Sequence, residues 1–142
     1  MKQLLVAAAL ALFLSGANAA APIPPDLIGV WSSDGAVFRG EAIWNGSAIY
    51  LDVDGVGAFV GGNGADVLGV RFVVTDYNAI THTLSVDMTE YGKVLKSINL
   101  IYDPEKHTIL SPTDQNRTYH KHSASFSAAM REKGLGLEPM HK

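Results

Sequence analysis

The fold of this chain is decided by residues 49–60, which read Ile49-Tyr50-Leu51-Asp52-Val53-Asp54-Gly55-Val56-Gly57-Ala58-Phe59-Val60. Asp-Gly between two alternating segments is a strong hairpin signal, because a type I′ turn requires positive φ at both central residues. A two-residue loop at Asp54 and Gly55 places Val53 opposite Val56. The pattern therefore predicts a hairpin with one aliphatic face, formed by Ile49, Leu51, Val53, Val56, Ala58 and Val60.

Short alternating segments recur on both sides of this hairpin. They cover residues 27–33, 39–44, 70–75, 84–88, 98–101 and 118–122, and each predicts a strand. Tight turns between so many short strands favour an antiparallel sheet that folds back on itself. We therefore predict an all-β protein, an antiparallel up-and-down barrel or a sandwich of about eight to ten strands.

One helix is expected, after the last strand. Residues 125–133 place Phe126, Ala129 and Met130 on one side of a helix, with Ser123 or Ser125 as the N-cap and Gly134 as the stop signal.

The chain also contains an internal echo. Residues 77–84 and 102–109 share the pattern Tyr, Asn or Asp, three variable residues, His-Thr and an aliphatic residue. Asn78 and Asp103 are natural turn starters, so the echo predicts two hairpins of one meander, each closed by a Tyr–His or Tyr–Thr pair. The alternative interpretation makes His82 and His107 a pair of functional groups.

The first 19 residues have the pattern of a secretory signal peptide. A positive Met1-Lys2 start precedes an apolar run over 4–14, and Ala17-Asn18-Ala19 is a cleavage site. The apolar run is too short to span a bilayer. We expect residues 1–19 to be removed and the protein to be soluble in a periplasm or in the medium. A flexible lead-in over 20–26, a barrel domain with its helix over 27–134 and a tail over 135–142 would follow.

Charge is unevenly distributed along the chain. Residues 26–90 contain nine acidic residues and two arginines, whereas residues 93–142 carry an excess of basic residues. The acidic half argues against nucleic acid as a partner and suits docking onto a basic protein. The predicted contacts are acids in turns or on an outward face, together with a glycine-rich loop at an open end: Asp34, Asp52, Asp54, Asp66, Gly61, Gly62 and Asn63.

The start of the predicted barrel resembles a known family. Residues 25–31, Pro-Asp-Leu-Ile-Gly-Val-Trp, are similar to the opening of lipocalin-like (calycin) barrels, where a short turn leads into Gly-x-Trp on the first strand. The resemblance implies a closed barrel and permits a ligand in its lumen. It also implies that Arg117, late in the barrel, packs over Trp31.

Signals for chemistry are sparse. The chain has no cysteine, no Gly-x-Ser-x-Gly elbow and no His-Glu-x-x-His motif, so no enzyme activity and no cofactor are expected. His120 and His122 share one face of a predicted strand, which leaves a metal site as a minor alternative.

Together these features predict an exported binding protein without disulfides. The first hypothesis is a protein partner, as for a periplasmic inhibitor or immunity protein. The alternative is a lipocalin-like carrier of a small apolar ligand, and metal binding or catalysis is ranked lower. A lumen filled by bulky side chains favours the first hypothesis, and an apolar cavity of roughly a few hundred Å³ favours the second.

Overall fold

The structure is a computed structural model, and it describes residues 23–134. The predicted signal peptide, residues 1–19, and the predicted tail, residues 135–142, lie outside the described residues. The elements are a short 3-10 helix, nine strands and one α-helix, in the order η1 Pro25–Leu27, β1 Gly29–Ser33, β2 Val37–Arg39, β3 Ala42–Leu51, β4 Val56–Asn63, β5 Val67–Asn78, β6 Thr83–Glu90, β7 Lys93–Asp103, β8 Thr108–Ser111, β9 Arg117–Ser123 and α2 Ala128–Gly134.

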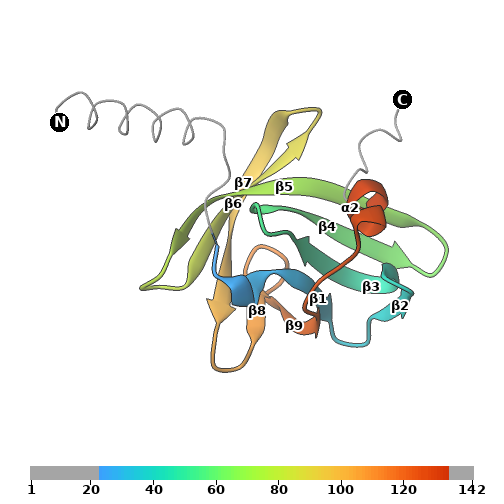
Figure 1. Ribbon diagram of the computed structural model, residues 1–142, viewed down its shortest axis with the longest axis horizontal. Helices are drawn as coiled ribbons and strands as arrows, with labels where there is room; N and C mark the ends of the chain where they lie inside the picture. Colours follow the sequence, from blue (N-terminus) through green and yellow to red (C-terminus); the bar gives the residue numbers. More distant parts are fainter. Residues whose placement is uncertain (1–22, 135–142) are drawn as a thin grey trace.

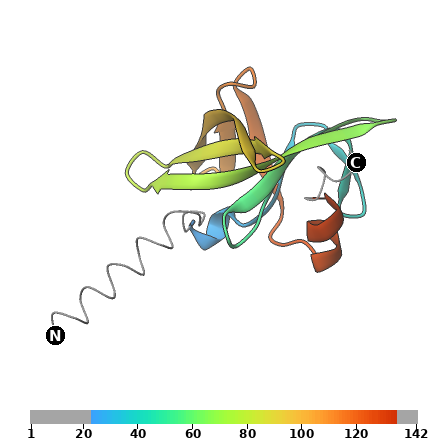
Figure 2. The same ribbon diagram turned by 90° about the horizontal axis from the view of Figure 1, so that it is seen from above.

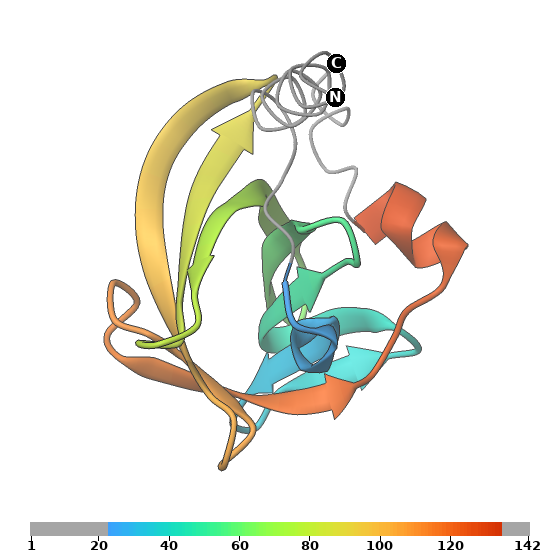
Figure 3. The same cartoon turned by 60° about the vertical axis from the view of Figure 1, so that its left-hand side comes forward.

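The strands form a closed antiparallel barrel. From β3 to β9 each strand pairs with the next one along the chain, β9 pairs with β1, and β1 pairs with β3 to close the ring. Eight strands make the barrel, and β2 is added to the edge of β3. Figure 3 shows the strands encircling the lumen. The predicted up-and-down barrel with one C-terminal helix is confirmed, and the sandwich alternative is wrong.

The core of the barrel is its lumen. Alternate residues of each strand point inward, so Trp31, Ile49, Phe72 and Leu84 come together from four strands and are fully buried. One end of the lumen is covered by η1, whose Leu27 is also fully buried. The Trp31 Nε1–H donates to the Leu27 carbonyl oxygen over 2.9 Å, which ties this cover to the first strand.

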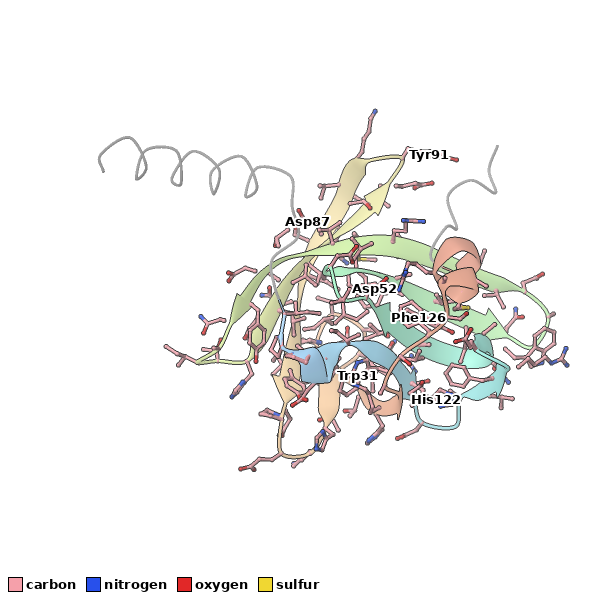
Figure 4. The ribbon with its side chains drawn as sticks, viewed as in Figure 1. Trp31, Asp52, Asp87, Tyr91, His122 and Phe126 are labelled. Carbon is pink, nitrogen blue, oxygen red and sulfur yellow. The ribbon has the colours of Figure 1, made fainter. Side chains whose placement is uncertain are left out.

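A second apolar cluster lies on the outer wall. Tyr50, Ala58 and Val60 point away from the lumen and are covered by the segment that leads into α2. The Phe126 ring meets Tyr50 edge-on, with ring centroids 5.7 Å apart. Figures 1 and 2 both place α2 outside the barrel wall, and Figure 4 shows Phe126 directed at that wall.

The helix begins later than the sequence predicts. Its first residue is Ala128 rather than Ser125, and the cap is Ser127, whose Oγ accepts the Met130 N–H over 3.1 Å. Ser127 is itself held by Glu41, which accepts its N–H and its hydroxyl over 2.8 and 2.6 Å. These bonds lower the pKa of Glu41. A contact from β2–β3 therefore fixes the helix start, and helical periodicity alone did not contain that information.

The register of the β3–β4 hairpin differs by one residue from the prediction. Leu51 pairs with Gly57 and Ile49 with Phe59, because the loop has three residues rather than two. The Gly55 N–H donates to the Asp52 carbonyl over 3.0 Å, and Gly55 has φ +83°. This is a type I turn closed by a left-handed glycine. Ala58 and Val60 therefore face the outer wall, and Val53 is 67% exposed in the turn.

The echo forms the two expected hairpins, β5–β6 and β7–β8. Asn78 Oδ1 and Asp103 Oδ1 each accept two backbone N–H groups of their turn, and His82 and His107 both end it in the left-handed region. The predicted pair closes the first hairpin, where the Tyr77 hydroxyl and His82 Nδ1 lie 3.1 Å apart. The equivalent hydroxyl of Tyr102 is buried without a hydrogen bond among the described residues.

Candidate binding site

A cavity of about 400 Å³ occupies the end of the barrel opposite η1. This open end carries the β4–β5, β6–β7 and β8–β9 turns. The β6–β7 hairpin projects beyond its neighbours, with Tyr91 at the tip, and the β4–β5 hairpin also reaches outward (Figures 2 and 4). The strands from β3 to β9 all contribute to the lining, which consists of Ser47, Ala48, Phe59, Val60, Gly61, Leu68, Gly69, Val70, Met88, Lys96, Ile98, Ser111, Thr113, Asp114 and Tyr119.

The floor of the cavity is apolar. Phe59, Met88 and Ile98 continue the lumen packing toward the open end. The Phe59 ring lies 4.7 Å from the fully buried Phe72 ring, which separates the cavity from the packed half of the barrel. Leu68, at the rim, leaves 73% of its surface exposed. An apolar group entering here would be removed from water on several sides, and this burial is the main source of affinity in such sites.

One side of the cavity is polar. Asp114, in the β8–β9 turn, accepts the Arg117 Nε–H over 2.8 Å and the Tyr119 hydroxyl over 3.3 Å. The hydrogen bond with Asp114 raises the pKa of Arg117. Burial, followed by the negative charge of Asp114, raises the pKa of Tyr119 to about 12. The Tyr119 hydroxyl therefore stays protonated at neutral pH. The Asp114 carboxylate is paired with Arg117 within the turn.

Lys96 is the cation of the cavity lining. It follows the inward alternation of β7 two residues before Ile98, and its side chain has no hydrogen bond or ion pair with the side chains that the structure describes, those of residues 23–131. An unpaired ammonium beside an apolar pocket can bind an anionic group without first breaking a contact of its own. The site thus combines an apolar floor, hydroxyl groups on one wall and one free positive charge.

The predicted glycine-rich segment lies at the open end of the barrel, but most of it is strand rather than loop. Gly61 lines the cavity, as expected for a residue at an open end, but residues 61–63 belong to β4. A Cβ on Gly62 would lie 2.4 Å from the Trp44 carbonyl oxygen, so this glycine permits close backbone approach. Asn63 starts the following turn, where its Oδ1 accepts the N–H groups of Ala65 and Asp66. The prediction of a loop from Gly61 is wrong because glycine here serves strand packing.

The four predicted acidic contacts do not form one surface. Asp34 and Asp66 lie in turns at the open end, whereas Asp52 and Asp54 lie in the β3–β4 turn at the opposite end. Asp34 is exposed and lies 3.3 Å from the Nε2 atom of His120. Asp54 is exposed and accepts the Val56 N–H. None of the four lines the cavity.

Asp52 is not an exposed acid, as the sequence predicts, but a buried one. Only 6% of the residue is accessible to solvent, and its carboxylate forms an ion pair with Arg131 of α2. Figure 4 shows Asp52 beside α2. The turn was correctly located, but the helix that covers it comes from a distant part of the sequence.

The ring of Trp31, in the middle of β1, is covered by a different cation from the one predicted. Lys121 lies over the Trp31 ring, with its Nζ atom 4.5 Å from the ring centre, and donates to the Asp26 carbonyl over 2.5 Å. Burial lowers the pKa of Lys121. The packing of Arg117 on Trp31 is wrong because Trp31 pairs with Lys121 in the β1–β9 register, whereas Arg117 begins β9 at the other end.

The two strand histidines each have a protein partner. The ring of His120 faces Asp34, and the ring of His122 is stacked on Phe38 with centroids 3.9 Å apart. Among the described side chains, those of residues 23–131, no group of three or more metal-ligating side chains comes together.

Most residues of the cavity carry no signal in the sequence that would identify them. Met88, Lys96, Ile98 and Tyr119 look like ordinary strand residues, and the signal that could have found them is their position. Each is an inward residue near the open end of its strand, which becomes visible only once strand directions and register are known.

No helix within residues 23–134 is long and apolar enough to cross a membrane. Comparisons with known protein families, with curated proteins and with solved structures find no match for this chain.

Proposed function

We propose that this chain is an exported binding protein that takes an apolar group of its ligand into the open end of the barrel. The observation that carries the proposal is the cavity of about 400 Å³, lined from β3 to β9 and floored by Phe59, Met88 and Ile98. This is the size range and the mixed lining typical of sites for small ligands. A structural core alone would fill the lumen at both ends.

The proposal favours the lumen over an acidic outer surface. The acids that suggested electrostatic docking are divided between the two ends of the barrel, and the carboxylate of Asp52 is already paired with Arg131. A single electrostatic footprint for a basic partner requires charges that face one way. The free charge at the cavity is positive, because it belongs to Lys96.

The closed barrel also supports the lipocalin-like part of the proposal. The short helix η1 leads into Gly29-Val30-Trp31, Trp31 is fully buried at the closed end, and a lysine covers its ring. Export rests on the signal-peptide pattern of residues 1–19, and we propose the periplasm or the medium as the compartment.

The test is binding of a neutral fluorescent probe, 1-aminoanthracene, to variants of Gly61. A Cβ at this position meets only the Gly46 carbonyl oxygen, at 3.9 Å, so alanine fits without strain, and a larger side chain would extend from this Cβ into the cavity that Gly61 lines. We expect saturable binding to the wild type, binding within about twofold for Gly61→Ala, and loss of at least about tenfold for Gly61→Phe. Equal binding by the wild type and Gly61→Phe would contradict the proposal.

A further inference from the structure

Strand β7 has a free edge beside the cavity. Its pairing with β6 runs from Lys93 to Ile101, whereas its pairing with β8 covers only Ile101 to Asp103. Within the described part of the chain, no strand therefore pairs with the second edge of residues 93–99. Figures 1 and 4 show this part of β7 in the projecting β6–β7 hairpin. Natural sheets rarely leave so long an edge open without a reason.

The hydrogen-bonding pattern identifies the backbone groups on that edge. The Tyr102 N–H donates to the His82 carbonyl over 2.9 Å, so Tyr102 directs its backbone groups toward the β6 side. Alternate residues of an antiparallel strand do the same, which assigns Ile98 and Leu100 to β6. The register is regular between Lys96 and Ile101. Ser97 and Asn99 therefore direct their N–H and C=O groups away from β6, toward the free edge.

The free edge of β7 lies next to the cavity. Lys96 and Ile98 line the cavity from β7, and Thr113 and Asp114 line it from the β8–β9 turn. A strand added to β7 would lie over this opening. Because side chains alternate across a strand, every second side chain of the added strand would point into the apolar part of the cavity.

We propose that the partner is an extended polypeptide segment that adds a strand to the free edge of β7, places alternate apolar side chains in the cavity and sets a carboxylate against Lys96. This rests on the proposed function, since the same cavity receives the ligand. On the neighbouring strand Glu90 lies opposite Lys93, and Asp87 Oδ1 accepts the Ser97 hydroxyl, so the positive charge that this edge presents to the cavity is that of Lys96. Antiparallel pairing with a second copy would bring the lysines of both copies together, whereas an acidic segment neutralises them.

The probe for this proposal is a short capped peptide in which Val alternates with Thr and Glu stands at both ends. Its control has Lys in place of both Glu residues. We expect the Glu peptide to bind more tightly than the Lys peptide, and the difference to be lost in Lys96→Ala. Two further versions carry N-methyl groups on alternate amides. Only one of them should lose binding, because only alternate peptide amides face β7. Equal binding by both would overturn the proposal.

The matched protein variants are Asn99→Pro and Asn99→Ala. Proline removes the N–H on the free edge and leaves the pairing of Ile98 and Leu100 with β6 in place, while alanine retains that N–H. We expect peptide binding to fall by about tenfold in Asn99→Pro and by less than about twofold in Asn99→Ala, with 1-aminoanthracene binding equal in both. Equal peptide binding by the two variants, with 1-aminoanthracene binding unchanged, would overturn the proposal.

Amide hydrogen exchange in the wild type keeps the proposal testable if Asn99→Pro fails to fold. In the free protein the Ser97 and Asn99 amides should exchange faster than those of Ile98 and Leu100, and the Glu peptide should slow them. Binding of 1-aminoanthracene without peptide binding would overturn this inference and leave the proposed function standing. A concentration-dependent dimer that disappears in Asn99→Pro would also overturn it, by assigning the edge to a second copy.

Discussion

Asp52 is the buried charge of the described residues, and two groups compensate for its lost hydration. Its Oδ1 atom accepts the Val53 N–H over 2.7 Å, and its carboxylate is paired with Arg131 of α2. A buried carboxylate is tolerated only when hydrogen bonds and an opposite charge replace water. The pair joins the first hairpin of the barrel to the C-terminal helix across 79 residues of sequence.

We predict that Asp52→Ala lowers the free energy of unfolding by about 2 kcal/mol, because both bonds to the carboxylate are lost. Arg131→Ala should cost at least as much in the same measurement, because it leaves the buried Asp52 carboxylate without its opposite charge. Urea denaturation measures both values. The control is Asp66→Ala, an exposed acid whose removal should change stability by less than about 0.5 kcal/mol. Equal stability of the Asp52→Ala and Asp66→Ala variants would contradict this assignment.

At the scale of elements, the β3–β4 hairpin tests the register. Leu51 is 1% exposed in the lumen, and Val53 is 67% exposed in the turn. We predict that Leu51→Asp unfolds the domain, because an unpaired charge in the core costs several kcal/mol, of the order of its whole stability. Val53→Asp should leave the melting temperature within a few degrees of the wild type. A two-residue loop would bury both side chains, so loss of folding in both variants would restore the rejected register.

This hairpin also shows how far an element can be predicted from its residues. Alternation and Asp-Gly correctly located both strands and the turn. The register was not determined, because Ile49, Tyr50 and Leu51 are all buried, two in the lumen and one under Phe126. When both faces of a strand are apolar, the hydrophobic pattern fits two registers that differ by one residue equally well. The observed register is stabilised by the left-handed conformation of Gly55 and by the packing of Phe126, from the segment before the distant helix, on Tyr50.

At the scale of the whole molecule, closure of the barrel buries tyrosine hydroxyls on both sides of its wall. Burial raises the pKa values of Tyr50 and Tyr119 to about 12, from an ordinary value of 10.0. Because the folded protein holds these groups neutral more strongly than the unfolded chain does, their contribution is complete below pH 10 and is lost as the pH rises through about 12.

We therefore predict a fall in stability between about pH 10 and 12 that is smaller in Tyr50→Phe and Tyr119→Phe. Ultraviolet absorbance of tyrosinate in the folded protein should show these two groups ionising after exposed tyrosines. If all the tyrosines of the folded protein ionise together near pH 10, the burial of Tyr50 and Tyr119 is wrong.

The barrel was predictable from the chain and its cavity was not. Period-two alternation and tight turns are local signals, and they recur often enough to specify an up-and-down topology. The cavity exists because the inward side chains near the open end, among them Phe59, Met88 and Ile98, do not fill the lumen there. The volume that stays unfilled depends on side chains from several strands that are far apart in the sequence. The predicted acids were chosen for local exposure, which does not reveal whether they share a face.

The most direct test of the proposed binding site is a methyl-resolved NMR titration of the whole protein with 1-aminoanthracene. Met88 and Ile98 report on the open end, Ile109 on the packed half of the lumen and Ile80 on an exposed turn at the closed end. We predict saturable shifts of the Met88 and Ile98 methyl groups, with little change at Ile109 and Ile80. Shifts confined to Ile80 or to the outer wall around α2, with Met88 and Ile98 unmoved, would contradict the assignment of the open end as the binding site.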